Sequence, residues 1–154
     1  MPQREAGSQH PDAENTTALL GQAYSALGHR IVAGVAEAGF PQRPAHSGVF
    51  AHIDVEGGTR LTELARRANI TPQAMGELVD DLERMGYVTR RPDPEDRRAK
   101  RVVLTGRGMA CVRAAFDTIG EIEGRLTELL GKQGLAHLRR SLIRVLESEG
   151  ERGS

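Results

Sequence analysis

Residues 61–105 read LTELARRANITPQAMGELVDDLERMGYVTRRPDPEDRRAKRVVLT, and they predict two short helices followed by a β-hairpin. Thr62 is placed to cap the first helix, and Asn69 tolerates the left-handed backbone that a tight turn needs. Thr71 is a good N-cap and Pro72 suits the first helical position, where its missing amide hydrogen costs nothing. A second helix is therefore expected to begin directly after a sharp turn.

The second helix is predicted to have one apolar and one polar face. Its apolar residues follow helical spacing, and Gly86 stands where a glycine commonly ends a helix: Met75, Leu78, Val79, Leu82 and Met85. Small, amide and acidic residues share the opposite face: Gln73, Ala74, Gly76, Glu77 and Asp80. Small and amide side chains in the first two turns suit contact with base edges.

Two β-branched segments follow, Tyr87–Arg91 and Arg101–Leu104, around a loop at 92–100. The loop carries the basic tip Asp96-Arg97-Arg98, which suits a phosphate-lined groove. A helix pair that runs into such a hairpin indicates a winged helix-turn-helix. The predicted fold class is therefore mainly α with a small β-hairpin wing.

These ordered pieces resemble the MarR-type (multiple antibiotic resistance regulator) transcriptional regulators. The similarity runs through LTELARRANITPQAM, LVDDLERMGYVTRRPDPEDRRAKRVVLT and a long helix that opens with GRG, and it covers most of residues 18–148. The DPEDRRAK wing before a Leu-Thr strand end is its most specific part. The resemblance implies a homodimeric regulator, expected to be a repressor, that binds a pseudo-palindromic double-stranded DNA site and is released by a small-molecule effector.

In this family the second helix of the pair lies in the major groove and the wing reaches the flanking minor groove. The resemblance therefore assigns DNA contacts to the following positions: Thr71, Gln73, Ala74, Gly76, Glu77, Arg84, Arg90, Asp96, Arg97, Arg98 and Lys100. Thr71 is expected to bond a phosphate, and the amide of Gln73 matches adenine in the major groove.

Within the wing, Asp96 is expected to orient an arginine, and Arg98, with Arg97, to enter a narrow A·T-rich minor groove. The cations Lys100, Arg90 and Arg84 are assigned to phosphates.

Two positions on the recognition helix allow more than one interpretation. Gly76 costs a helix interior about 0.5–1 kcal/mol relative to alanine, so either a base or backbone comes close, or the glycine packs against the first helix of the pair. Glu77 stands where many relatives have a longer donor or a cation. Its carboxylate could accept from cytosine N4 or exclude unfavourable sites through phosphate repulsion.

The formal net charge of the 154 residues is zero, but the charge is unevenly distributed. Residues 84–107 hold eight basic and three acidic side chains, a local excess of five positive charges. A local patch of this kind is enough for phosphate contacts. The alternative is a solvated, salt-bridged hairpin, and the adjoining helix pair favours DNA.

The remaining sequence is divided by composition. Residues 1–15 and 149–154 have little to bury and are predicted to be a disordered arm and tail around one domain at 16–148. The winged helix-turn-helix is expected at about 45–105, with a short helix from Ala45 to Ile53.

Long apolar stripes at about 16–40 and 106–148 predict helices that need a partner, with Thr105 as a cap and with interruptions at Gly131 and Gly134. The resemblance implies a dimer built from these N- and C-terminal helices; an intramolecular bundle would also cover the stripes.

A pocket for the effector is implied between the dimer helices and the DNA-binding lobe. Its candidate lining residues could equally be ordinary core: His29, His46, Phe50, Val112 and Phe116. The lone Cys111 allows a redox-sensing alternative, although a buried, inert thiol fits its apolar surroundings better.

Other classes of protein find little support in the sequence. The histidines lack a metal-ligand spacing, so neither a metal nor a cofactor is expected. Hydrolase, P-loop and dinucleotide motifs are missing, which argues against an enzyme. Without a signal peptide or membrane span, a cytoplasmic protein is expected. A winged-helix module used only for protein contacts remains the other alternative.

Overall fold

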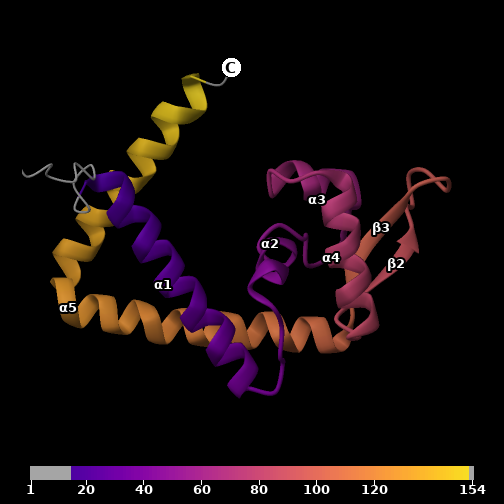
Figure 1. Cartoon of the computed structure of the whole chain (residues 1–154), viewed down its shortest axis with the longest axis horizontal. Helices are drawn as coiled ribbons and strands as arrows, with labels where there is room; N and C mark the ends of the chain where they lie inside the picture. The colour runs from indigo at the N-terminus through magenta and orange to yellow at the C-terminus, as the bar shows by residue number, and fades with distance from the viewer. Residues whose placement is uncertain (1–14, 153–154) are drawn as a thin grey trace, which may run out of the picture.

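The computed structural model describes residues 15–152 (Figure 1). The predicted N-terminal arm therefore lies outside the described residues, apart from Asn15. Two long helices, α1 (Thr16–Glu37) and α5 (Gly106–Arg152), cross each other. A compact lobe of short helices and a small sheet sits at the N-terminal end of α5.

Both ends of α1 have the expected local chemistry. The Asn15 side chain accepts a hydrogen bond from the Ala18 amide at 2.9 Å, and Gly39, just past the helix, has φ +92°. Near its C-terminal end α1 packs closely on α5: a Cβ on Gly34 would lie 2.5 Å from Thr118 Oγ1.

The long helix α5 begins and bends largely as predicted. Thr105 caps it, accepting from the Gly108 amide at 3.1 Å. Gly131, at φ 72° and ψ 160°, makes the bend. Two details were wrong: Gly134 stays helical, since Gly131 alone redirects the chain, and the helix continues to Arg152, four residues into the predicted tail at 149–154. The Glu and Arg residues at this end are good helix formers.

The short helix expected from Ala45 to Ile53 forms as two pieces, the 3₁₀ turn η1 (Pro44–His46) and α2 (Ser47–Phe50). A two-residue strand that the sequence did not predict, β1 (Thr59–Arg60), follows. It enters α3 (Leu61–Arg67) directly. Arg60 therefore holds the N-cap position without a side-chain cap bond, and the prediction that Thr62 caps this helix was wrong.

The turn and the second helix are confirmed. Asn69 has φ +54°, and α4 (Pro72–Arg84) begins at Pro72 with the Thr71 hydroxyl accepting from the Ala74 amide at 3.1 Å. Gly86, at φ +79°, follows the helix.

The hairpin strands β2 (Val88–Pro92) and β3 (Lys100–Leu104) join β1 in a three-stranded antiparallel sheet of order β1-β3-β2. Val102 pairs with Thr59 on one side and with Arg90 on the other. The wing is thus held from both edges of β3.

The core lies where α4, the sheet and the start of α5 meet. Its fully buried side chains include Leu64, Met75, Val79, Leu82, Tyr87 and Val102. Met85, predicted on the apolar face, is instead 36% exposed, because it is the C-cap residue and lies past the last turn.

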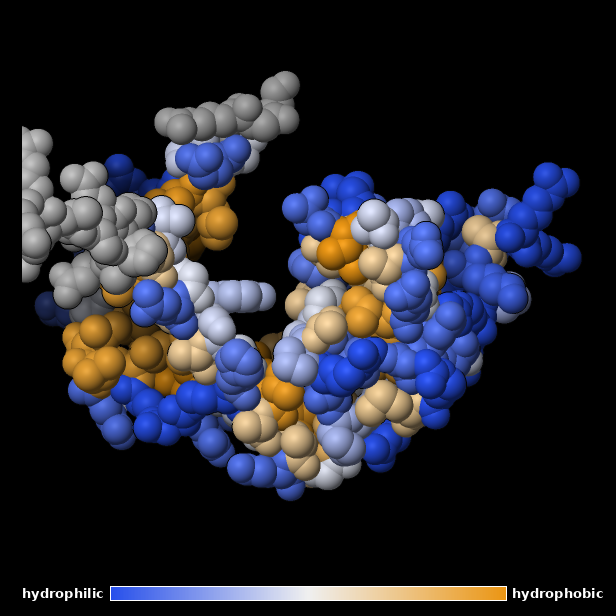
Figure 2. All heavy atoms as spheres, in the orientation of Figure 1, coloured by the Kyte–Doolittle hydropathy of each residue, from blue (hydrophilic) through white to orange (hydrophobic). Residues whose placement is uncertain are grey.

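Apolar surface gathers elsewhere on the molecule, over the bend of α5 and the adjacent part of α1, whereas hydrophilic residues dominate the wing (Figure 2). The exposed large apolar residues of α1 and of the second half of α5 include Leu19, Tyr24, Leu129, Leu130, Ile143 and Leu146.

Candidate nucleic-acid interface

The outward face of α4 begins at its capped N-terminus. Gln73 and Glu77 are exposed and Ala74 and Gly76 are half-buried. A Cβ on Gly76 would meet its nearest neighbour, Leu61 Cδ1, at 3.9 Å, which is ordinary van der Waals contact. Packing against α3 therefore does not require a glycine at this position.

Most acidic side chains of α4 are already paired. Arg90 on β2 donates from Nη2 to Asp80 Oδ1 at 2.6 Å, and its Nη1 also pairs with Glu83. The Arg90 backbone amide donates to Glu83 Oε1 at 3.1 Å as well. With a side chain only 25% exposed, Arg90 is a counter-charge for α4, in contrast to the phosphate contact that its place in a basic run predicted.

Further along α4, Asp81 is held by two guanidinium groups. Arg84, predicted to contact phosphate, pairs with it from the same helix, and Arg43 pairs with it from the segment before η1. Arg84 keeps an exposed side chain, so this pair leaves part of its guanidinium facing solvent.

The base of the wing is anchored by Asp93, a residue that the sequence reasoning passed over. Its carboxylate is fully buried and accepts from Arg60 Nε at 2.6 Å and from the Glu95 amide at 2.9 Å, with Arg101 Nε at 3.0 Å. These partners, Arg101 foremost, hold the pKa of the Asp93 carboxyl well below its usual range. The sequence did contain a signal for this anchor. An aspartate stands where a strand passes into a loop, and the neighbouring strands carry arginines.

At the tip of the wing, Asp96 shapes the backbone. Its Oδ1 accepts from the Arg98 amide at 3.0 Å, and its carbonyl accepts from the Ala99 amide at 2.9 Å. The predicted role of Asp96, to orient an arginine, is thus carried out on the main chain of Arg98, because an Asx turn uses the carboxylate locally.

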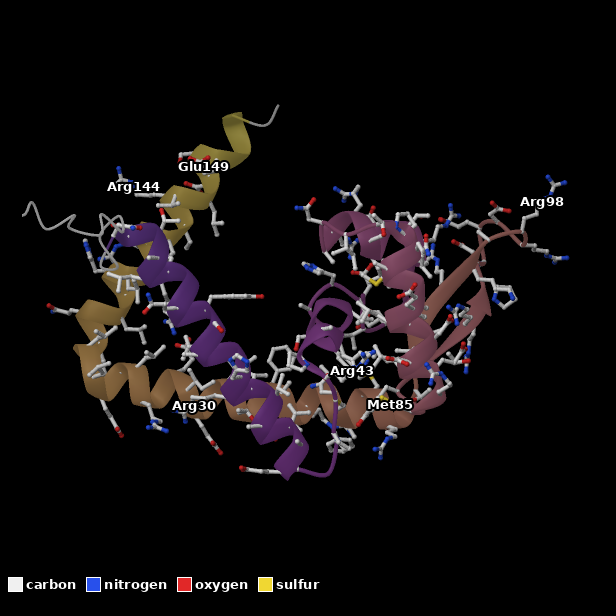
Figure 3. The ribbon with its side chains drawn as sticks, viewed as in Figure 1. Arg30, Arg43, Met85, Arg98, Arg144 and Glu149 are labelled. Carbon is white, nitrogen blue, oxygen red and sulfur yellow. The ribbon has the colours of Figure 1, made fainter. Side chains whose placement is uncertain are left out.

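Arg97 and Arg98 project from this turn as exposed side chains, and within residues 15–150 neither has an ion pair. Figure 3 shows Arg98 at the outermost point of the hairpin, pointing away from the body. The hairpin therefore presents uncompensated positive charge on an anchored support.

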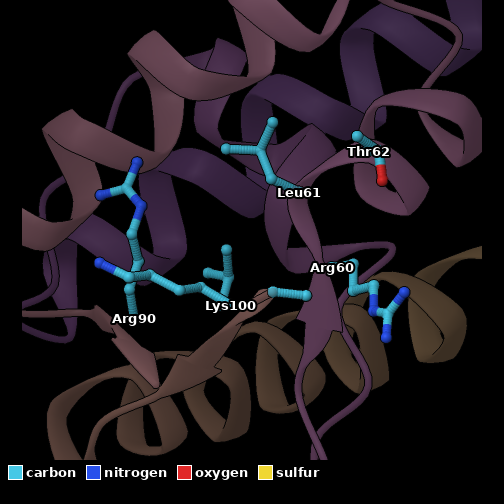
Figure 4. Close-up of a pocket in the computed structure, with 7 residues that line it drawn as sticks. Arg60, Leu61, Thr62, Arg90 and Lys100 are labelled. Atoms are coloured by element: carbon cyan, nitrogen blue, oxygen red, sulfur yellow. The ribbon is translucent and has the colours of Figure 1, made fainter. Parts of the chain in front are cut away.

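A groove separates the hairpin from the start of α3 (Figure 4). Arg90 and Lys100 border it from the two strands, and Leu61 and Thr62 from the helix. Lys100 is exposed and, among the described residues, has no carboxylate partner, so it stays available for a phosphate.

The residues proposed for an effector pocket are distributed over different parts of the structure. His46 is buried, with Nδ1 accepting from the Arg43 amide at 3.1 Å and Nε2 3.5 Å from Asp81 Oδ2. Phe50 packs edge-on against Tyr87 at 5.8 Å. Val112 is half-buried on α5, while His29 on α1 and Phe116 on α5 are exposed.

A hollow between α1 and α5 is lined by residues that the sequence did not predict as pocket residues, four of them members of the apolar stripes: Leu27, Arg30, Ile122, Arg125, Leu126, Glu128 and Leu129. The pattern of apolar stripes carries no signal for such a hollow, since it depends on where two distant helices cross.

Cys111 is 1% exposed, and burial raises the pKa of its thiol to about 11. Because the thiolate is the reactive form, this environment opposes the redox-sensing alternative. Across the described part of the chain, acidic, histidine and cysteine side chains form no cluster that could hold a metal ion. In the same residues, every helix is too short or too polar to cross a bilayer.

Known proteins resemble this chain in sequence and in structure. A family model described as MarR family matches residues 42–99, from the segment before η1 to the wing. The HTH-type transcriptional regulator PrsX of Escherichia coli is 35% identical over 88 residues, 50% of this chain and 53% of PrsX. The chain thus spans about half the length of this curated relative.

Solved structures resemble nearly the whole chain. The transcriptional repressor CouR, bound to a 23-mer DNA duplex, superposes with a TM-score of 0.71 at 28% identity, covering 87% of this chain and 94% of CouR. CouR from Rhodococcus jostii RHA1, bound to p-coumaroyl-CoA, gives 0.68 at 22% identity, covering 86% and 92%.

Proposed function

We propose that the chain is a DNA-binding transcriptional regulator of the MarR family, not an enzyme, and that it represses its target genes. The proposal rests on two exposed arginines, Arg97 and Arg98, which have no ion pair among the described residues. They lie on an anchored hairpin beside the exposed face of α4. The CouR structure on duplex DNA supports the proposal.

In this function the first two turns of α4 enter the major groove. The Gln73 amide is exposed and matches the donor and acceptor pair of adenine. Thr71 uses an oxygen lone pair for its cap, which leaves its hydroxyl hydrogen to donate to a phosphate. Arg98 reaches the minor groove, where narrow A·T-rich stretches attract guanidinium groups.

The regulator acts as a homodimer on a pseudo-palindromic site. Exposed leucines at the bend and on the last part of α5, together with Tyr24 on α1 at 83% exposure, form apolar surface that a second copy would bury. A twofold dimer presents two α4 helices to successive major grooves.

A small-molecule effector releases the DNA. The binding of p-coumaroyl-CoA by CouR supports this part of the proposal, and the hollow between α1 and α5 is one place for such a ligand. A ligand that binds better to a dimer with displaced α4 helices lowers the affinity of the dimer for DNA. Bound DNA must lower the affinity for the ligand by the same factor. As part of this proposal, the protein acts in the cytoplasm.

Anisotropy titration against the DNA upstream of its own gene, at two salt concentrations and with unrelated DNA as competitor, tests the proposal. Tight binding that resists competitor and falls steeply with salt is expected. The alternative hypothesis is a winged-helix module used only for protein contacts. It predicts no salt-sensitive binding to this DNA or to any fragment of a genomic library.

A further inference from the structure

We propose that Glu77 is a specificity-determining residue that selects a cytosine in each half of the operator by accepting a hydrogen bond from the cytosine N4 amino group. This inference rests on the proposed function and deepens it, because it states which base one residue of α4 reads. It follows from how the acidic side chains of α4 are paired.

Glu77 lies on the part of α4 that faces outward. It is exposed and stands four residues after Gln73, so the two side chains are neighbours on the same helix face. The capped N-terminus at Thr71 places both within the first two turns, the part of a recognition helix that meets base edges.

The other carboxylates of α4 are held by guanidinium groups. Asp80 and Glu83 are bound by Arg90, and Asp81 by Arg43 and Arg84. These pairs neutralise the part of α4 that would otherwise repel the phosphates.

Glu77 differs from these three. Within residues 15–150 it has no ion pair, and no basic residue stands three or four positions away on the helix: these positions hold Gln73, Ala74, Asp80 and Asp81. An unpaired carboxylate carried into the groove must find a hydrogen-bond donor there or weaken binding.

The major groove offers such a donor. In the major groove cytosine presents one hydrogen-bonding group, its N4 amino donor. Guanine presents only acceptors there, and thymine presents an acceptor and a methyl group. Adenine has both a donor and an acceptor, which suit the amide of Gln73 better than a carboxylate. Four residues of helix span about 6 Å, so the cytosine is expected within about two base pairs of the adenine read by Gln73.

The same carboxylate also rejects wrong sites. Facing guanine or thymine it meets an acceptor, and facing phosphate it is repelled, so Glu77 lowers affinity for non-cognate DNA as well as favouring cytosine.

Selection of bound duplexes from a random-sequence library tests this inference, with the wild-type protein, Glu77→Gln and Asp80→Asn. Asp80→Asn is the matched control, since it removes a carboxylate three residues further along α4 that Arg90 already holds. Wild type and control are expected to enrich one symmetric motif with a cytosine at a fixed position in each half. Glu77→Gln should lose that preference, bind the wild-type motif at least about fivefold less tightly and bind random DNA more tightly.

The outcomes separate the inference from the function beneath it. If Glu77→Gln and wild type enrich the same motif, or if Asp80→Asn loses the cytosine as well, the assignment of Glu77 is overturned while DNA binding stands. If wild type enriches no motif, the proposed function fails, and this inference with it.

Discussion

Arg90 and Arg98 lie eight positions apart in one basic run, yet their surroundings give them opposite roles. Arg90 stands on β2 opposite Val102 and turns toward the carboxylates of α4, whereas Arg98 stands on the exposed turn. Composition treats the two alike, because which cation is compensated depends on contacts between α4 and the sheet. The sequence therefore predicted the basic character of the wing but could not identify which cations are free.

Arg98→Ala is expected to weaken operator binding by more than about 1 kcal/mol and to reduce the slope of log affinity against log salt by about two, roughly one for each protomer of the dimer. Arg144→Ala is the control, since Arg144 is exposed on the far leg of α5, away from the wing (Figure 3). Anisotropy titration across a salt series measures both quantities. Equal losses in the two variants would show that the wing is not seated in the groove.

His46 is predicted to make stability depend on pH. Burial, and then the nearby Arg43, lower its pKa below the usual value of about 6.5. A proton on Nδ1 would also break the hydrogen bond that this nitrogen accepts from the Arg43 amide. On the other side of the ring, Asp81 faces Nε2 and would favour a charged ring, but Arg43 and Arg84 already bind that carboxylate. Between the folded and unfolded pKa values the unfolded chain binds more protons, so the contribution of His46 to stability is present above pH 6.5 and is lost as the pH falls toward the folded value.

Thermal unfolding at pH 7.5 and pH 5.5 checks this prediction. The wild-type melting temperature should fall more between the two pH values than that of His46→Gln, whatever the absolute stability of the variant. His137→Gln, at an exposed position on α5, should retain the wild-type difference. Parallel behaviour of wild type and His46→Gln would count against a neutral, buried His46.

Among the elements, those with strong local signals were predicted best. The cap at Thr71, the left-handed Asn69 and the stop at Gly86 each follow from one residue and its immediate neighbours. Strand β1 was missed because two residues carry no periodicity, and it is defined only by pairing with β3, more than forty positions later in the chain. The anchor at Asp93 was missed for the same reason, since its arginine partners come from β1 and β3.

The junction between the hairpin and α5 is another contact that sequence alone does not show. The Thr105 hydroxyl lies 2.5 Å from the Gly86 carbonyl and 3.1 Å from that of Tyr87, joining the end of α4 and the start of β2 to the start of α5. Gly108 faces the same Tyr87 carbonyl, and a Cβ there would stand 2.0 Å from its oxygen.

Gly108→Ala is therefore expected to destabilise the fold by about 1–3 kcal/mol or more, because backbone must move to admit the methyl group. Gly106→Ala, two residues earlier on the same helix, meets nothing within 4 Å and should be neutral or slightly stabilising. Urea unfolding of both variants measures the difference. A Gly108→Ala protein as stable as Gly106→Ala would contradict the close packing at this junction.

For the whole molecule, the assembly that we propose follows from the uneven distribution of exposed apolar side chains. Exposed leucines cluster on the second half of α5, far from the lobe that carries the wing. The sequence predicted the stripes but left open whether the chain folds back to cover them; in the structure the chain turns at Gly131, and the last part of α5 lies on the side of α1, apart from the lobe that carries the wing.

Leu146→Glu should convert the dimer to a monomer at micromolar concentration, because Leu146 is 72% exposed in the single chain and a dimer would bury its side chain without a partner for the new charge. Leu146→Met keeps the volume and the apolar character and should remain dimeric. Sedimentation velocity distinguishes the species. A wild-type protein that sediments as a monomer would overturn the dimer itself.

The rigid joint at Thr105 also gives the wing a long lever. From Gly106 to the bend at Gly131, at 1.5 Å per residue, α5 is a straight arm of about 38 Å. Rotating such an arm by roughly 10° about the bend displaces the joined end by about 6–7 Å, which is comparable with the width of the minor groove. A small rotation at the bend would thereby be magnified at the arginine tip, so in the proposed complex the registration of the wing on DNA would report on events at the opposite end of the protein.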